Sequence, residues 1–174
     1  GAGVAIGDLN NDDLPDLFFA GNDVPNKMYF NQGNMQFKDV TAKAGISGNK
    51  WSTGVSMVDV NGDGWLDVYV CNSGPDADSL STENEMWINQ QDGTFVDESV
   101  AMGINDPALS TQAVFFDMDN DGDQDLWVLN HSERGLGNQS YEWLGAMKAL
   151  PFEKQRLLSN TIYENQGNGK YKDV

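Results

Sequence analysis

The sequence has little cysteine, histidine or basic charge, with one cysteine, one histidine and ten lysines and arginines among 174 residues. A single cysteine, Cys71, forms no disulfide within the chain, which excludes a disulfide-stabilised scaffold. Against 27 acidic residues and a net charge of −17, the basic residues form no stripe of the kind that nucleic acids and anionic membranes need. No apolar run is long enough to span a bilayer, so direct membrane insertion is not expected.

Acidic residues, by contrast, recur in three loops of one pattern: DLNNDDLPD from Asp8, DVNGDGWLD from Asp59 and DMDNDGDQD from Asp117. Positions 1, 3, 5 and 9 of each loop carry oxygen side chains, and position 7 can offer its backbone carbonyl. Calcium prefers such flexible sets of oxygen ligands, whereas magnesium demands a stricter octahedron. We therefore predict about three calcium sites, with the ligands Asp8, Asn10, Asp12, Leu14 and Asp16, then Asp59, Asn61, Asp63, Trp65 and Asp67, then Asp117, Asp119, Asp121, Asp123 and Asp125.

The electrostatics of the loops favour this interpretation. Like charges about 4 Å apart repel by about 4 kcal/mol per pair at an effective dielectric constant of about 20, so each loop needs a cation. Three calcium ions would change the net charge from −17 to −11. The alternative is that Asp, Asn and Gly serve only as turn residues, but three loops with the same offsets favour ligands. The first loop fits less well, because Asp13 stands where Gly64 and Gly122 suit the left-handed backbone expected there.

The residues at position 12 and the flanking segments exclude an EF-hand. An EF-hand completes its cage with a bidentate glutamate at position 12, whereas position 12 is Phe19, Val70 and Val128 here. The segments around the second loop, GVSMVDV and WLDVYVC, have the short apolar or alternating pattern of strands. The loops are therefore expected at the tips of β-hairpins.

A second hairpin motif comes after each loop: MYFNQGNMQFKDV from Met28, MWINQQDGTFVDE from Met86 and IYENQGNGKYKDV from Ile162. An apolar strand, a turn of Asn, Gln and Gly, and a strand with an aromatic residue are typical of a tight hairpin. Each unit thus has four strands, and the units are 1–48, 49–106 and 107–174. Four-stranded units that repeat at about 40 to 60 residues predict an all-β fold of about three antiparallel propeller blades.

These motifs resemble the FG-GAP or VCBS repeat family of calcium-loop β-propellers, known from integrin α-subunit heads, and within it the cartilage-acidic-protein branch. The family pattern is an apolar strand, DxDxDGxxD, a second apolar strand and an LYxNxGDGTFxDVT hairpin, which residues 59–67 and 86–97 match best. The resemblance covers the whole chain. It implies a secreted or surface-displayed propeller, usually of seven blades, whose loops bind calcium for stability and whose opposite face meets partners. It does not imply catalysis.

Three blades would leave unpaired edges and apolar blade faces at both ends of the array. Both ends of the chain also fall inside the repeat pattern. We therefore expect the chain to be part of a larger ring, whose remaining blades come from the same parent chain.

The spacing of the motifs separates two faces of the propeller. Asn31 and Asp59 are 28 residues apart, as are Asn89 and Asp117, so the second hairpin and the next loop keep a fixed spacing. The segment from position 9 to the hairpin Asn varies instead, at 15, 22 and 40 residues. In an up-and-down blade this variable connection leaves from the end opposite the acidic loops. Variable loops on a rigid scaffold are where binding residues tend to lie.

The longest insertion, residues 131–159, is the candidate contact surface. It carries a net charge of +1, against −18 for the rest of the chain. Its aromatic and cationic residues would suit a protein or glycan partner, and the candidates are His131, Arg134, Tyr141, Trp143 and Lys148. The alternative is that a short helix here, with apolar residues at helical spacing, packs onto its own blade.

The sequence is compatible with three functions. We expect an extracellular calcium-binding module for adhesion or for protein or glycan binding, because extracellular calcium modules work at about 0.1 to 1 mM, well above cytosolic calcium. His131 with Glu133 and Glu142 would instead supply acid–base groups to a polysaccharide lyase or hydrolase, although a solvent-facing or capping histidine is the simpler interpretation. The third possibility is a purely structural subunit of a cell-surface assembly.

Overall fold

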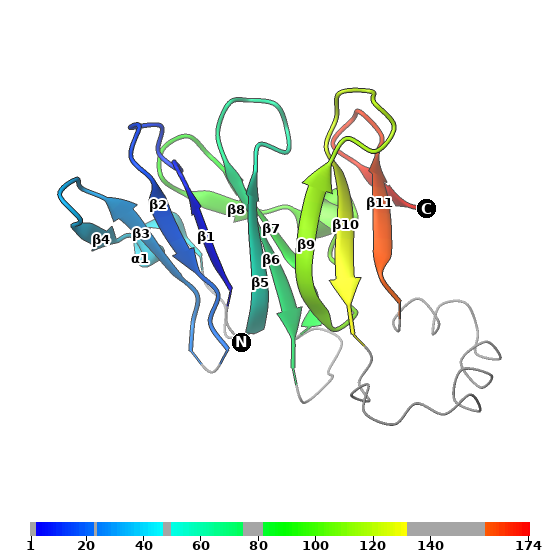
Figure 1. Ribbon diagram of the computed structural model, residues 1–174, viewed down its shortest axis with the longest axis horizontal. Coiled ribbons are helices and arrows are strands. Elements are labelled where there is room, and N and C mark those ends of the chain that lie inside the picture. The colour runs from blue at the N-terminus through cyan, green and yellow to red at the C-terminus, as the bar shows by residue number, and fades with distance from the viewer. Residues whose placement is uncertain (1–2, 23, 47–49, 75–81, 132–158) are drawn as a thin grey trace.

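The computed structural model describes residues 3–22, 24–46, 50–74, 82–131 and 159–174, and this part of the chain is built mainly from β-strands. Its strands form three four-stranded antiparallel sheets, each made of strands that are consecutive in sequence (Figure 1). The first sheet contains β1 (Val4–Gly7), β2 (Asp16–Phe19), β3 (Lys27–Asn31) and β4 (Phe37–Asp39). The second contains β5 (Trp51–Val58), β6 (Asp67–Ser73), β7 (Glu85–Asn89) and β8 (Phe95–Asp97). The third contains β9 (Ser110–Phe116), β10 (Asp125–Asn130), β11 (Thr161–Asn165) and β12 (Tyr171–Asp173).

The sheets are the blade-like meanders that the sequence predicts. Each acidic loop joins the first two strands of its sheet, and the loop closes at a pair formed by its position-9 aspartate. These pairs are Gly7 with Asp16, Val58 with Asp67, and Phe116 with Asp125. The flanks of the loops are therefore strands, as expected, and not the helices of an EF-hand.

The acidic loops and the variable connections lie at opposite ends of the sheets. The β1–β2, β5–β6 and β9–β10 loops all lie along the top edge of Figure 1. The strand ends that lead into the β2–β3, β6–β7 and β10–β11 connections lie along the bottom edge. We call these the acidic-loop end and the insertion end.

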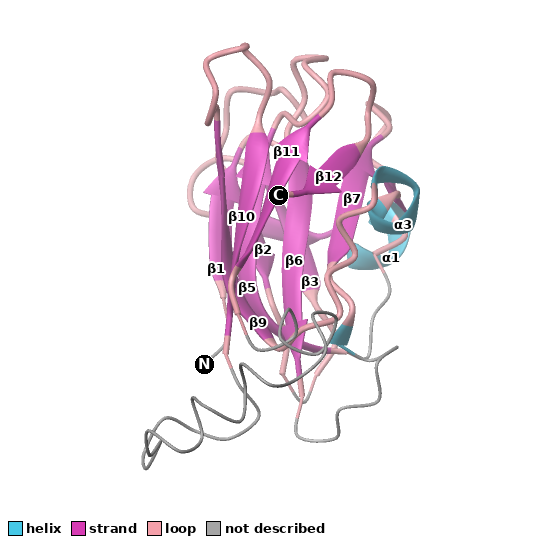
Figure 2. Ribbon diagram, turned by 90° about the vertical axis from the view of Figure 1, so that its right-hand side faces the viewer, coloured by secondary structure: helices cyan, strands magenta, loops and turns pink. Residues whose placement is uncertain are grey.

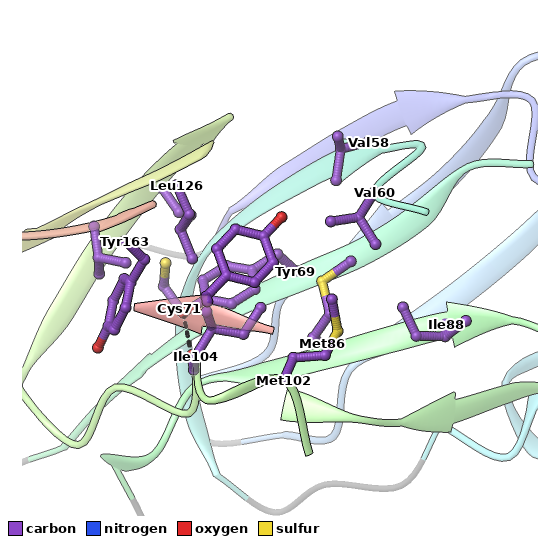
Figure 3. Packing of buried hydrophobic residues seen from close by; sticks show 13 residues of the cluster. Val58, Val60, Tyr69, Cys71, Met86, Ile88, Met102, Ile104, Leu126 and Tyr163 are labelled. Atoms are coloured by element: carbon purple, nitrogen blue, oxygen red, sulfur yellow. Dashed lines mark hydrogen bonds between the residues drawn. The ribbon is translucent and has the colours of Figure 1, made fainter. Parts of the chain in front are cut away.

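Both faces of the middle sheet are covered. Side chains alternate across a strand, so Val68 and Val70 of β6 join the cluster shared with the first sheet, while Tyr69 joins the cluster shared with the third. The Tyr69 ring meets Phe115 edge-on, with centroids 5.7 Å apart. Its hydroxyl donates to the carbonyl of Ile104 at 2.8 Å (Figure 3). The cluster that the middle sheet shares with the third sheet contains Val58, Val60, Tyr69, Cys71, Met86, Ile88, Met102, Ile104, Ala113, Leu126, Val128, Tyr163 and Tyr171.

The outer faces of the first and third sheets are open within the described chain. Phe19 is 42% exposed, whereas Val70 and Val128, at the same repeat position in the other sheets, are 0% exposed. Trp127 is 40% exposed, whereas its counterpart Tyr69 is fully buried. Phe19 and Trp127 therefore occupy positions that are packed against a neighbouring sheet elsewhere in the array. Among the described residues, no neighbouring sheet covers these positions on the outer faces of the first and third sheets.

Two short helices, α1 (Thr41–Ala44) and α3 (Ser99–Met102), come after the last strands of the first and second sheets. Both end at a glycine in the left-handed conformation, Gly45 at φ 76° and Gly103 at φ 81°, which is a common way to stop a helix. Figure 2 shows both helices on one side of the molecule, away from β1. The sequence pattern did not predict them, and the short helix expected in the longest insertion, with Trp143, Met147 and Leu150 at helical spacing, lies outside the described residues. Among the described helices, none is long and apolar enough to cross a bilayer.

Candidate functional site

Each acidic loop is organised by its own side-chain oxygens, which accept hydrogen bonds from loop N–H groups. In the second loop, Asp59 accepts from the backbone N–H of Asp63 at 3.0 Å and of Gly64 at 2.9 Å. Asn61 accepts from the same Asp63 N–H at 3.0 Å, and Asp63 accepts from Trp65 at 2.9 Å. The first loop repeats these bonds through Asp8, Asn10 and Asp12, and the third through Asp117, Asp119 and Asp121. The side-chain oxygens of positions 1, 3 and 5 are thereby drawn toward the inside of each turn.

Position 7 of each loop is occupied by Leu14, Trp65 and Asp123. In all three loops its backbone N–H donates to the carboxylate of position 5, at 2.9 to 3.0 Å. This bond fixes the peptide next to the carbonyl that the sequence pattern assigns as a ligand. The ligand role of that carbonyl stays a prediction.

The aspartate at position 9 joins the loop to the second hairpin of the same sheet. Asp67 accepts from the N–H of Val60 at 3.1 Å and, through its other oxygen, from the N–H of Asn89 at 2.8 Å. Asp16 and Asp125 make the same pair of bonds in their own sheets. Burial raises the pKa of Asp67 to about 6 and also raises the pKa of Asp16. A nearby cation would favour the ionised form of these buried carboxyl groups.

The donor set of the loops suits a hard cation. In the third loop, one carboxylate oxygen from each of Asp117, Asp119 and Asp125 lies within 4.8 Å of the others. The first and second loops have Asn10 and Asn61 at position 3, where an amide oxygen replaces a carboxylate. Carboxylate and amide oxygens, without nitrogen or sulfur, are the ligands that calcium takes in proteins. The residues of all three loops therefore match calcium chemistry, and the third offers the most negative set.

The backbone of the loops explains which residues stand between the predicted ligands. Position 6 is left-handed in every loop, with φ 66° at Asp13, 85° at Gly64 and 95° at Gly122, as the sequence pattern predicts. Position 4 is left-handed as well, at Asn11 (φ 54°), Gly62 and Asn120. Asn and Gly are the residues that adopt this conformation most readily. The recurrence of Asn or Gly at position 4 was the sequence signal for this second turn.

Asparagines that the sequence pattern did not assign to the site bracket the third strand of each sheet. Asn31, Asn89 and Asn165 end that strand, and each donates its backbone N–H to the position-9 aspartate at 2.8 Å. At the other end of the strand, the side-chain oxygens of Asn26, Asn84 and Asn160 accept the N–H of Gly21, Asn72 and Asn130. The signal in the sequence is the repeat Asn-x4-Asn, as in NKMYFN, NEMWIN and NTIYEN.

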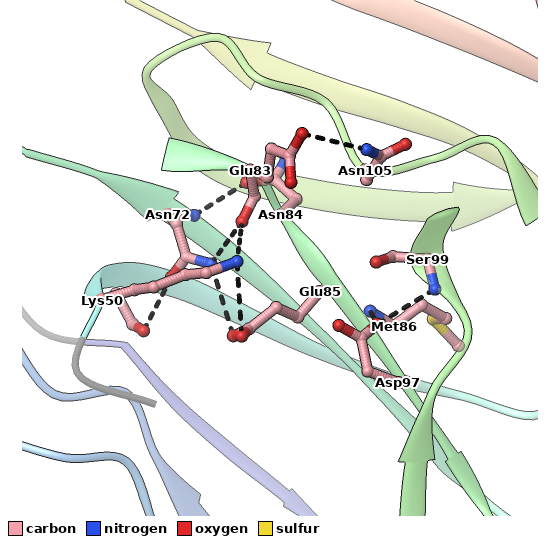
Figure 4. Close-up of polar contacts among 10 residues, drawn as sticks. Lys50, Asn72, Glu83, Asn84, Glu85, Met86, Asp97, Ser99 and Asn105 are labelled. Carbon is pink, nitrogen blue, oxygen red and sulfur yellow. Dashed lines mark hydrogen bonds and ion pairs between the residues drawn. The ribbon is translucent and has the colours of Figure 1, made fainter. Parts of the chain in front are cut away.

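The described part of the insertion end presents polar groups. Lys50 donates to the carbonyl of Glu83 at 2.8 Å and lies 3.4 Å from the Glu85 carboxylate (Figure 4). Asn72 donates to the same Glu83 carbonyl at 2.8 Å, and Asn105 donates to the Glu83 carboxylate at 3.3 Å. Burial raises the pKa of Glu85, against the opposing effect of Lys50.

One of the five predicted contact residues lies in the described chain. His131 is exposed at the insertion end, with its backbone N–H bonded to the carbonyl of Leu109 at 2.9 Å and its ring Nε2 3.2 Å from the Ser73 hydroxyl. The other four, Arg134, Tyr141, Trp143 and Lys148, lie outside the described residues, as do Glu133 and Glu142.

Comparison with known proteins links the loops to a repeat family. Residues 8–70 match the model of the FG-GAP-like repeat. The chain is 29% identical over 126 residues to cartilage acidic protein 1 of Mus musculus, an alignment that covers 72% of this chain and 18% of that protein. It is 26% identical over 137 residues to cartilage acidic protein 1 of Xenopus tropicalis, covering 78% of this chain and 20% of that protein. The chain thus spans about a fifth of the length of the relatives it matches.

Proposed function

Because the chain carries an FG-GAP-like repeat, we propose that it is part of an extracellular calcium-binding β-propeller that serves as a protein- or glycan-binding module. Calcium would have a structural role here, because it would draw together loop carboxylates that otherwise repel one another. The position-9 aspartates would extend this stabilisation beyond the loop, because each one also accepts a hydrogen bond from the second hairpin of its sheet.

The threefold repetition of one carboxylate geometry is the observation that carries the proposal. A turn that needed only its backbone shape would not require a buried aspartate with a raised pKa, as at Asp67. The oxygens of Asp117, Asp119 and Asp125 lie within 4.8 Å of one another, close enough to share one cation in the third loop. An extracellular location follows from the millimolar calcium that exposed loops of this kind need.

Calcium titration of the intact protein by calorimetry tests the metal sites. We expect binding at submillimolar to millimolar calcium and a rise in melting temperature that chelation reverses. Asp121→Ala removes the position-5 carboxylate of the third loop and should reduce the stoichiometry by one. Asp92→Ala is the matched control, because Asp92 is an exposed aspartate in the neighbouring β7–β8 hairpin. Equal melting temperatures with and without calcium would contradict the proposal.

The partner-binding face is proposed to be the insertion end. Its support is the variation in connection length there, together with the rule that loops on a rigid scaffold carry binding residues. Replacing residues 136–156 with a short Gly-Ser linker should abolish binding to a glycan or peptide array and leave calcium-dependent melting unchanged. Unchanged array binding would rule out the insertion as the contact surface.

Closure into a larger ring is proposed from the open faces. An apolar groove on the first sheet is lined by Leu17, Phe19, Tyr29 and Phe37, with Lys27 at its side. A further blade that covered this groove would bury Phe19, whose counterparts Val70 and Val128 are already buried in the other two sheets. Phe19→Asp in the intact protein should then lower the melting temperature strongly, whereas a solvent-facing Phe19 would tolerate the change.

Two alternative functions remain from the sequence. The enzymatic alternative depends on His131 with Glu133 and Glu142, and both glutamates lie outside the described residues. Turnover of a uronic-acid polymer that is lost in His131→Ala would support it. The purely structural alternative predicts that the insertion end is permanently buried in an assembly, so that array binding is absent for the wild-type protein as well.

A further inference from the structure

Asn89 touches two acidic loops at once. Its backbone N–H holds Asp67 of the second loop at 2.8 Å. Its side-chain Nδ2 donates to the carbonyl of Leu66 in the same loop at 3.1 Å, and to the carbonyl of Leu9 in the first loop at 2.8 Å. The residue is 3% exposed, so these bonds are protected from competing water. Asn89 therefore connects the backbone of the first loop with a ligand of the second.

A second bond joins the same two loops from the opposite direction. Asn11, at position 4 of the first loop, donates through Nδ2 to the carbonyl of Gly64 in the second loop at 3.2 Å. Leu9 is next to the ligand Asp8, and Gly64 is next to the ligand Asp63. Each bond thus ends on a peptide group that adjoins a predicted ligand.

The second and third loops share no such bond among the described residues. Asn165, the counterpart of Asn89, donates instead to the carbonyl of Gln124 at 3.3 Å and to the hydroxyl of Tyr171 at 3.2 Å. Both partners belong to its own sheet. Blade two has Phe95 where blade three has Tyr171, and a phenylalanine ring offers no hydroxyl, so the amide of Asn89 is left to reach the neighbouring loop.

Two further features separate the second and third loops. Position 4 of the second loop is Gly62, which has no side chain to repeat the bond of Asn11. A cavity of about 220 Å³ also lies between these loops, lined by Asp59, Asn61, Gly122 and Asp123 among others. The two junctions between neighbouring loops are therefore built differently, although the loops themselves are alike.

We infer that the first and second loops bind calcium cooperatively through Asn89 and Asn11, whereas the third loop binds independently of them. The inference rests on the proposed calcium function. A cation orders the backbone of its loop, and the two interloop bonds transmit that order to the neighbouring loop. The second ion then has less conformational entropy to remove, which gives positive coupling without a change of fold.

Hydrogen exchange of the intact protein across a calcium titration resolves the loops as separate peptides. Asp12→Ala empties the first loop, and the matched control Asp121→Ala empties the third while removing the same charge. In Asp12→Ala, the calcium concentration for half-protection of residues 59–67 should rise by about five-fold or more, the lower range of measured coupling. In Asp121→Ala that midpoint should stay within about two-fold of wild type, a smaller factor than this coupling range.

Removal of the interloop bonds should abolish the difference between the effects of Asp12→Ala and Asp121→Ala on the calcium midpoint of residues 59–67. Asn11→Gly keeps the left-handed backbone that Gly62 adopts in the second loop, and Asn89→Ala keeps the main-chain bond to Asp67. In the Asn11→Gly, Asn89→Ala double variant, Asp12→Ala should no longer shift the midpoint of residues 59–67. Asn165→Ala is the control for loss of an equivalent buried amide. If Asn89→Ala fails to fold, Asn11→Gly alone should reduce the shift.

The outcomes separate the coupling from the proposed function. Equal shifts from Asp12→Ala and Asp121→Ala would overturn the coupling, as would a shift that persists in the double variant, and in both cases the loops would still bind calcium. An absence of calcium protection in all three loops would overturn the proposed function and the coupling with it.

Discussion

The two ends of each sheet use the same kind of hydrogen bond with different acceptors. At the acidic-loop end, an aspartate carboxylate accepts the N–H of the residue that ends the third strand, as Asp67 does from Asn89 at 2.8 Å. At the insertion end, an asparagine amide oxygen accepts the N–H of a residue near the end of the second strand, as Asn84 does from Asn72, also at 2.8 Å. All three sheets have both bonds.

The two kinds of acceptor indicate which end responds to the surroundings. An amide oxygen carries no charge and does not titrate in water. A buried carboxylate can carry a negative charge and titrates with pH. The strength of its hydrogen bond therefore depends on pH and on any cation nearby. The carboxylate bonds at the acidic-loop end should therefore vary in strength with calcium and pH, whereas the asparagine-amide bonds at the insertion end should not.

The largest effect should come from Asp67→Ala. The substitution leaves the N–H groups of Val60 and Asn89 without their acceptor, at about 1 to 3 kcal/mol each, so we expect a loss of about 4 kcal/mol in the free energy of unfolding. Calcium should then stabilise the protein less than it does the wild type. Denaturant unfolding with and without calcium measures both. Asn84→Ala, the counterpart at the insertion end, should cost the same with and without calcium, and a calcium-dependent cost there would contradict the distinction between the two ends.

The next effect is the pH dependence of the calcium-free protein. The pKa of Asp67 is about 6 in the fold and 3.8 is the ordinary value. Because the folded pKa is the higher one, the contribution of Asp67 to stability is fully present below about pH 4 and is lost as the pH rises through about 6. The loss amounts to at most about 3 kcal/mol, at 1.36 kcal/mol per pKa unit. Unfolding of chelated protein between pH 4 and 7 measures it.

Asp67→Asn supplies the control for this pH dependence. The amide cannot ionise, so the chelated variant should lose most of the decline in stability between pH 4 and 7. Added calcium should reverse the slope in the wild type, because the cation favours the ionised carboxylate. A decline that is as steep in Asp67→Asn as in the wild type would assign it to other groups.

A smaller effect is expected from Lys50→Met at the insertion end. The change leaves the Glu85 carboxylate, 4% exposed, without the ammonium group 3.4 Å away. We expect a loss of about 2 kcal/mol at neutral pH, below the range for fully buried pairs because Lys50 is partly exposed. The loss should shrink in acid, since burial raises the pKa of Glu85 and its protonated form needs no partner. The Lys50→Met, Glu85→Gln pair should recover stability at pH 7, and calcium should alter none of these values.

The fold was predictable from the sequence because its signals repeat. Three acidic loops and three NQ-containing hairpins specify four strands per unit, and the short apolar or alternating pattern of segments such as GVSMVDV specifies their type. The helices α1 and α3 were missed because four residues are too few to show helical periodicity. Glycine after TAKA and SVAM was the available signal for their ends.

The site was predictable only in part. Side-chain ligand candidates can be deduced from spacing along one loop, whereas the bonds of Asn89 join residues that lie 80 and 22 positions away in the sequence. No pattern within one repeat reveals such contacts, because they depend on how neighbouring sheets pack. The second loop also forms different junctions with the first and third loops, and this difference depends on Phe95 in blade two and Tyr171 in blade three. In the sequence alone, the two residues look like equivalent aromatic positions.

The smallest effect in this series should come from Tyr69→Phe, which tests the covered core near the insertion end. The Tyr69 hydroxyl donates to the Ile104 carbonyl at 2.8 Å and accepts from Asn84 at 3.1 Å. Its removal keeps the ring packed against Phe115 and should cost about 1 kcal/mol, the net value of a typical buried hydrogen bond. Tyr29→Phe, on the open face, is the matched control with little expected effect. Because no carboxylate is involved, the cost should be equal at pH 5 and pH 7 and with or without calcium, and dependence on either would show that the two ends are not independent.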